Sequence, residues 1–143
     1  MDVFGAVSPA PKAGGQKLFT TDKARRALPL VRRIVKDIVA SVELLAGVEE
    51  EFADARYESS AESLEALADR RQRVQDRLRE LVDELSELGV LLKDSRCGLV
   101  DFPARYQNRV VYLCWRLGEE NITHWHEVDA GFTGRQPIGP DFE

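Results

Sequence analysis

Two long stretches with the apolar spacing of amphipathic helices fill the first half of the chain and restrict what it can fold into. In the first stretch the apolar residues advance by four and three positions, with position 49 skipped: Val31, Val35, Ile38, Val42, Leu45 and Phe52. The second stretch keeps the same spacing, with position 71 skipped: Leu64, Leu67, Val74, Leu78, Leu81, Leu85 and Leu88. Steps of three and four place these side chains on one face of a helix. The sequence therefore predicts two long helices that pack against each other.

The limits of these helices follow from residues that end or interrupt helical structure. We expect helical segments over about residues 21–28, 29–57 and 61–88. Pro29 should either kink the helix or begin a new one, because proline lacks an amide donor and disfavours helical geometry in the residue before it. Gly89 is in the usual position to end the last helix. Two long helices joined by a short loop predict an antiparallel, coiled-coil-like hairpin.

Two charged residues, Glu49 and Arg71, occupy positions within the apolar spacing. Folding the chain about the loop brings them within about one helical turn, so we predict that they pair and help to fix the register. Ile34, Val39 and Val48 widen the apolar stripe of the first helix beyond what one partner helix can cover. We therefore expect the C-terminal region and a second copy of the chain to cover it, which predicts a homodimer with a four-helix arrangement.

After Gly89 the pattern changes to short segments rich in β-branched and aromatic residues. We expect strands over about residues 98–103, 110–117 and 122–128. Residues 118–121 contain a glycine and an asparagine that suit a turn between the last two strands. The predicted fold class is α+β, a long antiparallel helical hairpin followed by a small three-stranded antiparallel β-meander packed on it.

The predicted hairpin of the last two strands holds the rarest side chains of the sequence. A loop over residues 118–121 sets its register, and alternation then places His124 and His126 on the apolar face that also carries Trp115. Cys114 falls on the opposite face. This register excludes a pair between Cys114 and a histidine, and we expect Cys114 to pack as a small hydrophobic residue.

The two histidines are the strongest chemical feature of the sequence. His124 and His126 lie on one side of the predicted strand, about 7 Å apart at the backbone, where they can share a metal ion. Asp129, just beyond the strand, or Asp101 from the neighbouring strand is the expected third ligand. Zinc or iron suits such ligands, and haem is a less favoured cofactor. The alternative is that both histidines are partly buried and hydrogen-bonded, without a bound ligand.

Trp115 and Arg135 offer a second kind of binding site. An indole ring can serve as a platform for a small ligand. Arg135 lies in the glycine-containing segment 129–137, where its guanidinium group can bind an anion. The alternative interpretations are that Trp115 packs in the core and that the segment wraps the sheet for structural reasons.

Four motifs along the chain are distinctive: ALPL before the long helix, GLVDFP, YLCWRLGE and HWHEVDAGFTGRQP. Together with FT near the start, they resemble a prokaryotic family known as domain-of-unknown-function family 2203. The resemblance covers about residues 18–138. It implies the boundaries of a single domain, and it brings no activity, cofactor or catalytic residue.

Composition limits the classes of function. The net charge of −5 argues against nonspecific nucleic-acid binding, which usually needs a basic face. No apolar run reaches the roughly 18 residues that cross a bilayer, and the N-terminus lacks the features of a signal peptide. Two cysteines do not make a disulfide framework, so a cytoplasmic protein is expected. A length of 143 residues suits one domain, placed at 17–138 between tails at 1–16 and 139–143.

Two hypotheses follow. The leading one is a cytosolic homo-oligomeric module with a metal or small-ligand site lined by His124 and His126, and with no catalysis assigned. The alternative is a non-enzymatic adaptor or assembly protein that acts through its coiled-coil helices and whose histidines are structural.

Overall fold

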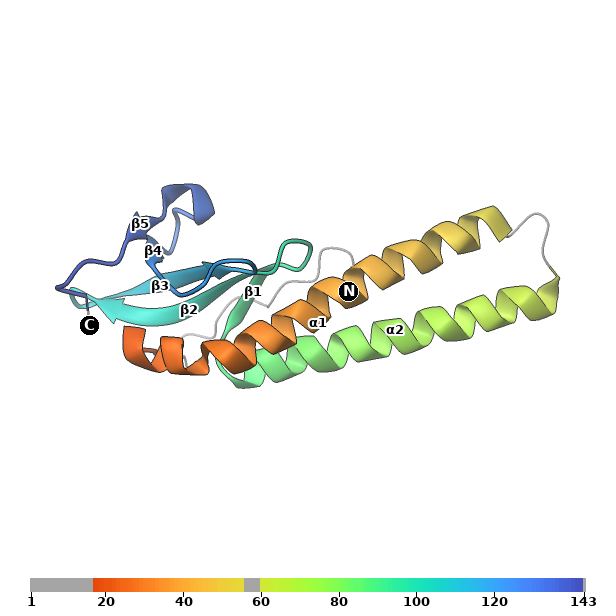
Figure 1. The fold of residues 1–143 in the computed structure, drawn as a ribbon, viewed down its shortest axis with the longest axis horizontal. Coiled ribbons are helices and arrows are strands. Elements are labelled where there is room, and N and C mark those ends of the chain that lie inside the picture. Colours follow the sequence, from red (N-terminus) through yellow and green to blue (C-terminus); the bar gives the residue numbers. More distant parts are fainter. Residues whose placement is uncertain (1–16, 56–59, 143) are drawn as a thin grey trace.

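The computed structural model describes residues 17–55 and 60–142, which form a helical hairpin and an antiparallel sheet (Figure 1). Helix α1 covers Thr21–Ala55 and helix α2 covers Ala61–Glu87. The strands and a short 3-10 helix follow: β1 (Leu91–Asp94), β2 (Leu99–Tyr106), β3 (Arg109–Arg116), β4 (His124–Glu127), η1 (Phe132–Gly134) and β5 (Gln136–Pro137). The α+β class is confirmed, but the sheet has five strands, in the order β1-β2-β3-β4-β5, where three were predicted. The predicted tail at 1–16 and the helix-connecting residues 56–59 lie outside the described residues.

The two strands missing from the prediction lie at the edges of the sheet. β1 includes Lys93 and Asp94, which have the composition of a loop, and Asp94 lies opposite Leu99 after an irregularity in the register. β5 has two residues, of which Pro137 pairs with His124 although proline lacks an amide donor. Edge strands are often short and carry charged residues or proline. Their sequences therefore resemble loops.

Helix α1 continues through Pro29, so the expectation that a new helix begins there is wrong. A proline inside a helix costs about 3 kcal/mol or more through a lost hydrogen bond and a steric clash. Leu28 and Val31, on either side of it, are both buried in the hydrophobic core. Packing before and after the proline offsets this cost and keeps the helix continuous.

The two helices are antiparallel, and the sheet lies over the end of the hairpin that holds the start of α1 and the end of α2 (Figure 1). The other end extends well beyond the sheet. Arg71 Nη1 lies 3.5 Å from Glu49 Oε1, and 35% of each side chain is exposed. Such a half-exposed ion pair contributes at most about 1 kcal/mol, and its role in the register stays a prediction. Neither described helix combines the length and the apolar character needed to cross a membrane.

One face of the sheet packs on the helices. Phe102, Leu113 and Trp115 belong to a buried core that includes residues of both helices. The turn between β1 and β2 approaches α1 closely at Gly98, whose φ is +72°. A Cβ atom at this glycine would lie 2.8 Å from side-chain atoms of Val35 and Leu117, so no larger residue fits. The packing also extends towards the end of the chain, because Phe142 contacts this core.

The register between β3 and β4 differs from the predicted one by one residue. Cys114 lies opposite His124, and the connection takes residues 117–123 where a turn at 118–121 was predicted. A shift of one residue moves every side chain of a strand to the other face. The prediction that separated Cys114 from the histidines is therefore wrong.

Contacts with α1 hold this longer connection in place. Arg25 donates two hydrogen bonds, of 3.1 and 3.0 Å, to the backbone oxygen of Ile122. Arg32 donates one of 2.7 Å to the backbone oxygen of Glu120. Ile122 itself is fully buried. The helix thus fixes the length of the connection, and with it the face of the sheet that the histidines occupy.

Candidate metal site on the outer face of the sheet

Three adjacent strands each contribute one side chain with metal-ligating chemistry to the outer face, which points away from the helices. Asp101 on β2 lies opposite Cys114 on β3, and Cys114 lies opposite His124 on β4. His126 is two residues further along β4 and therefore shares their face. The pairing of β2, β3 and β4 thus gathers Asp101, Cys114 and His126 although they are far apart in the sequence.

The donor atoms of Asp101, Cys114 and His126 converge on one region. One carboxylate oxygen, the cysteine Sγ and one ring nitrogen all lie within 4.8 Å of one another. His126 Nε2 lies 3.0 Å from Asp101 Oδ1, and Cys114 adjoins this pair as the third donor. The three residues are 1–3% exposed. The structure therefore contains a compact and buried set of nitrogen, oxygen and sulfur donors.

Both ring nitrogens of His126 face oxygen atoms. Nδ1 lies 2.7 Å from the backbone oxygen of Glu127, and Nε2 faces the Asp101 carboxylate, so both nitrogens donate when the ring is protonated. Burial opposes the charged form, but the hydrogen bonds with Asp101, Cys114 and Glu127 outweigh it and raise the pKa of His126 to about 10. At neutral pH His126 is therefore an imidazolium that pairs with Asp101 beside the Cys114 side chain.

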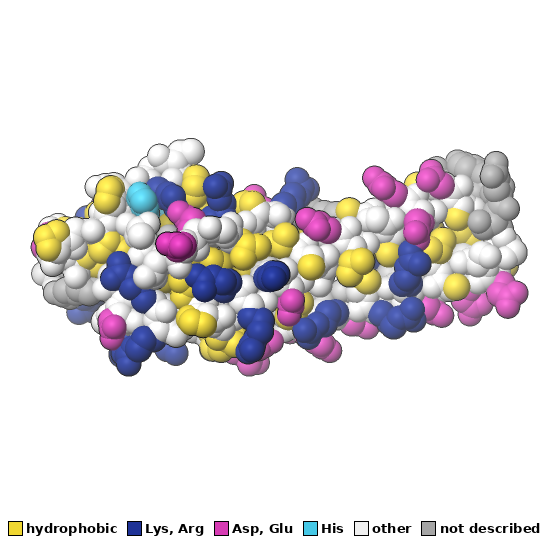
Figure 2. Space-filling model, viewed as in Figure 1, with side chains coloured by type: hydrophobic (Ala, Val, Ile, Leu, Met, Phe, Trp, Pro, Cys, Tyr) yellow, Lys and Arg dark blue, Asp and Glu magenta, His cyan; other side chains and the backbone are white. Residues whose placement is uncertain are grey.

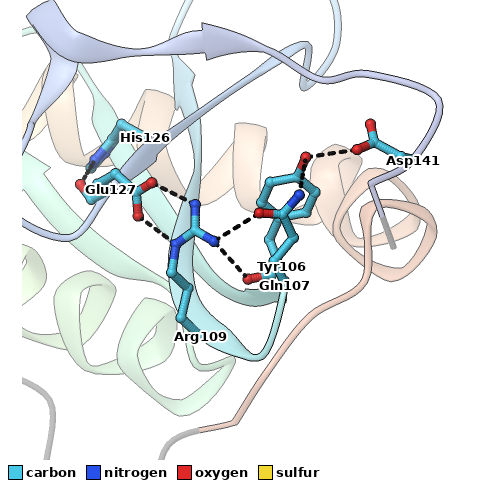
Figure 3. A network of polar contacts seen from close by, with 6 residues as sticks. All are labelled: Tyr106, Gln107, Arg109, His126, Glu127 and Asp141. Atoms are coloured by element: carbon cyan, nitrogen blue, oxygen red, sulfur yellow. Dashed lines mark hydrogen bonds and ion pairs between the residues drawn. The ribbon is translucent and has the colours of Figure 1, made fainter.

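A network of polar contacts anchors Glu127, whose carbonyl orients the His126 ring (Figure 3). Arg109 donates to both carboxylate oxygens of Glu127, at 2.9 and 2.6 Å, and holds the pKa of this carboxyl below its usual range. Arg109 also reaches the backbone oxygen of Tyr106, whose hydroxyl donates to Asp141 at 2.8 Å. These contacts restrict the end of β4 and, through it, the direction of His126 Nε2.

A second ion pair borders the site on the side of Cys114. Arg135 donates to both carboxylate oxygens of Glu119, at 3.1 and 2.8 Å, and Glu119 and the nearby Cys114 raise the pKa of Arg135. Burial opposes ionisation of Glu119, but Arg135 and the amide of Arg116 hold the pKa of Glu119 below its usual range. The Arg135 guanidinium also stacks over the Phe132 ring at 4.4 Å. The C-terminal segment therefore reaches across the outer face as far as Cys114.

The structure brings together only some of the residues that the sequence singled out. Asp101 and His126 meet, whereas Asp129 is exposed beyond β4 and is not part of the donor cluster found among the described residues. His124 shares the outer face, with Nδ1 2.8 Å from the Thr123 hydroxyl. Trp115 is fully buried and donates to the backbone oxygen of Glu119, so its ring offers no ligand platform.

Arg135 and Cys114 are also placed differently from the expectation. Arg135 forms a half-buried ion pair with Glu119, which occupies the guanidinium group that was considered for an anion. Cys114 is a member of the donor cluster and not an isolated small hydrophobic residue. One signal in the sequence favours this arrangement. Burying Trp125 against the helices removes more apolar surface from water than burying the two histidines that flank it, and this orientation puts both histidines on the face of Cys114.

The arrangement of donors differs from that of a catalytic cysteine. A cysteine nucleophile needs a histidine that contacts the thiol through one ring nitrogen and an orienting carboxylate through the other. Here Nδ1 is occupied by the carbonyl of Glu127, so Nε2 is the nitrogen left to face both Asp101 and Cys114. Three donors that converge on one point are typical of a metal site, and nitrogen, oxygen and sulfur donors suit zinc in particular.

The fold and this cluster define a small α+β protein that has a buried set of potential metal ligands on three adjacent strands. The chain belongs to a family described as uncharacterized conserved protein (DUF2203), whose model matches residues 17–138. The resemblance inferred from its motifs is thereby confirmed. No curated protein and no solved structure matches the chain.

Proposed function

We propose that the protein binds a divalent transition-metal ion, zinc being the best fit, through Asp101, Cys114 and His126. The convergence of their three donor atoms within 4.8 Å carries this proposal. The hydrogen bond from His126 Nδ1 to the carbonyl of Glu127 supports it. Histidines that bind metals through one nitrogen commonly donate the other N–H to a backbone carbonyl, which fixes the tautomer and the ring orientation.

The charges of the cluster also suit a divalent ion. With protons in place, the carboxylate of Asp101 balances the imidazolium of His126, and the Cys114 thiol is neutral. With an ion bound, its two positive charges balance the carboxylate and the thiolate, and the imidazole is neutral. The neighbouring Arg135 and Glu119 balance each other in both cases. Because an unbalanced charge is costly in a buried site, exchange of two protons for one divalent ion keeps the site neutral throughout.

Zinc binding at pH 7 is therefore expected to release protons, among them the imidazole proton of His126. Because the pKa of His126 is about 10, almost every molecule carries the imidazole proton at pH 7, and the apparent affinity should rise with pH. The measurement is calorimetric titration of untagged, chelator-treated protein in two buffers with different ionisation enthalpies. Substoichiometric zinc in this titration, or binding without proton release, contradicts the proposal.

The proposed setting is the reducing cytoplasm. Cys97 and Cys114 are free thiols, one exposed and one buried. A thiol that serves as a metal ligand must stay reduced, and cytoplasmic redox systems maintain that state. The proposed role is metal binding without an assigned reaction.

We propose as a second function that two copies associate through the part of the hairpin beyond the sheet. Leu44 is 61% exposed there, beside a groove of about 640 Å³ that Ala40 and Val48 also line. Two of the charged residues at its rim, Arg70 and Glu51, form an ion pair with each other. The apolar side chains that line the groove suit an apolar partner, and Leu44 of a second copy supplies one. Figure 2 shows apolar side chains along the hairpin between the charged ones.

Leu44→Glu is expected to shift the protein from dimer to monomer in light scattering at micromolar concentration, because a carboxylate would have to be buried in the contact. Val39 is unsuitable for this test, since it packs beside Gly98 and a charge there would disturb the fold. Glu43→Gln, at the rim of the same groove, is the matched control. A monomeric wild type contradicts the association.

A further inference from the structure

A zinc ion held by Asp101, Cys114 and His126 lacks one ligand of the four that zinc usually takes in a structural site. His124 is the nearest unused donor by position in the sheet. It lies directly opposite Cys114, and Asp101 lies opposite Cys114 on the other side. Side chains in opposed positions of antiparallel strands have Cβ atoms about 4.5–5.5 Å apart. An ion bound to Cys114 Sγ therefore has Asp101 of β2 on one side and His124 of β4 on the other. His126 lies two residues further along β4.

We propose, on the basis of the metal-binding function above, that His124 turns from Thr123 towards Cys114 and becomes the fourth ligand of the ion. The move requires rotation of one side chain and no change of register, because His124 already projects from the outer face. The ring is half-buried, and its hydrogen bond to the Thr123 hydroxyl is the one that it forms among the described residues. The cost of losing this hydrogen bond is small, because water can replace the Thr123 hydroxyl as its partner at an exposed position.

Other candidates for the fourth position are less suitable. The carboxylate of Glu119 accepts two hydrogen bonds from Arg135 and one from the amide of Arg116. Recruiting it would leave the half-buried guanidinium without its carboxylate. Asp129 is exposed and lies beyond the end of β4. His124 carries neither of these disadvantages.

Four protein ligands have a consequence for the kind of site. Catalytic zinc sites keep one position open for water or substrate, whereas structural sites are closed by four protein ligands. With Asp101, Cys114, His124 and His126 bound, no position is left for a substrate. The positive charge of Arg135 near Cys114 then stabilises the thiolate from outside the set of ligands. The site would hold its ion to join three strands, not to perform a reaction.

The test compares cobalt(II) and zinc binding by wild type, His124→Ala and Thr123→Val, with folding checked by circular dichroism. Wild type should show the intense visible bands of four-coordinate cobalt and two imidazoles around zinc in X-ray absorption. His124→Ala should keep the thiolate-to-cobalt band, but its visible bands should be weaker and X-ray absorption should show one imidazole around zinc instead of two. Its affinity for the metal should fall at least about tenfold, because removing a residue that only supports a ligand already lowers metal affinity by about that factor. Thr123→Val removes the competing hydroxyl and should bind at least as tightly as wild type.

The results separate the two proposals. Wild-type affinity and a wild-type spectrum in folded His124→Ala overturn the fourth-ligand assignment and leave the three-ligand site in place. A wild type that binds neither cobalt nor zinc overturns the metal-binding function itself and the assignment that rests on it.

Discussion

Replacing Cys114 with serine is expected to weaken zinc binding by at least about 100-fold, which corresponds to about 2.8 kcal/mol. Cys114 is the sulfur donor of the cluster and supplies one of its two negative charges in the zinc-bound site. A serine hydroxyl stays protonated near neutral pH, so the variant site would carry a net positive charge in a buried position. The measurement is competition at pH 7 between the protein and a chromophoric chelator.

Cys97→Ser is the matched control for this variant. Cys97 is exposed in the turn between β1 and β2, and it is not part of the donor cluster. Partial burial, together with the nearby Asp94 carboxylate, raises the pKa of the Cys97 thiol, which makes it a poorer ligand still. This variant should bind zinc like wild type. Equal losses in both variants would show that the zinc is held elsewhere or nonspecifically.

Asp101→Ala is expected to lower the free energy of unfolding of chelator-treated protein by about 3–5 kcal/mol, the usual cost of removing one partner from a buried ion pair. Asp101 and His126 are 2% and 3% exposed, so neither charge is compensated by water. Loss of the carboxylate leaves the imidazolium without its counter-charge, and His126 must give up its proton. Urea unfolding at pH 7 measures the difference, with Asp101→Asn as the variant that keeps the side-chain shape.

The pH dependence of the free energy of unfolding tests the same ion pair. The pKa of His126 rises from 6.5 to about 10 on folding, so the folded state binds this proton more tightly than the unfolded state. The resulting stabilisation is fully present below about pH 6.5 and disappears as the pH rises through 10. Wild-type protein with chelator should therefore lose stability between pH 7 and 10, and Asp101→Ala should lose much less. Parallel curves for the two proteins would contradict a coupled pair.

The helices were predictable because their evidence is local. The three-four spacing of apolar residues appears within each segment, and the structure contains both helices close to the expected limits. Pro29 is the exception, since the packing that keeps α1 continuous comes from residues distant in the sequence. The ion pair of Glu49 with Arg71 also followed from spacing, because an antiparallel hairpin with a short loop has few possible registers.

The candidate site was predicted only in part, because its geometry depends on one non-local feature. Asp101 and His126 were named from their residue types and strand positions. Cys114 was excluded because the connection after β3 was taken to be shorter than it is. The hydrogen bonds that determine the length of this connection come from Arg25 and Arg32. These residues lie 97 and 88 positions away from the carbonyl groups that they bind. No pattern within the hairpin contains that information, and a difference of one residue decides which face the histidines occupy.

The distribution of the donors over β2, β3 and β4 has a consequence for the order of events during synthesis of the chain. Asp101, Cys114 and His126 come from three consecutive strands, and none of the three strands alone holds more than one of these donors. A nascent chain that ends before β4 can form the helical hairpin, because its contacts are local, but it has no place to retain an ion. Metal capture would therefore come late and would report that the last third of the chain has reached its final register.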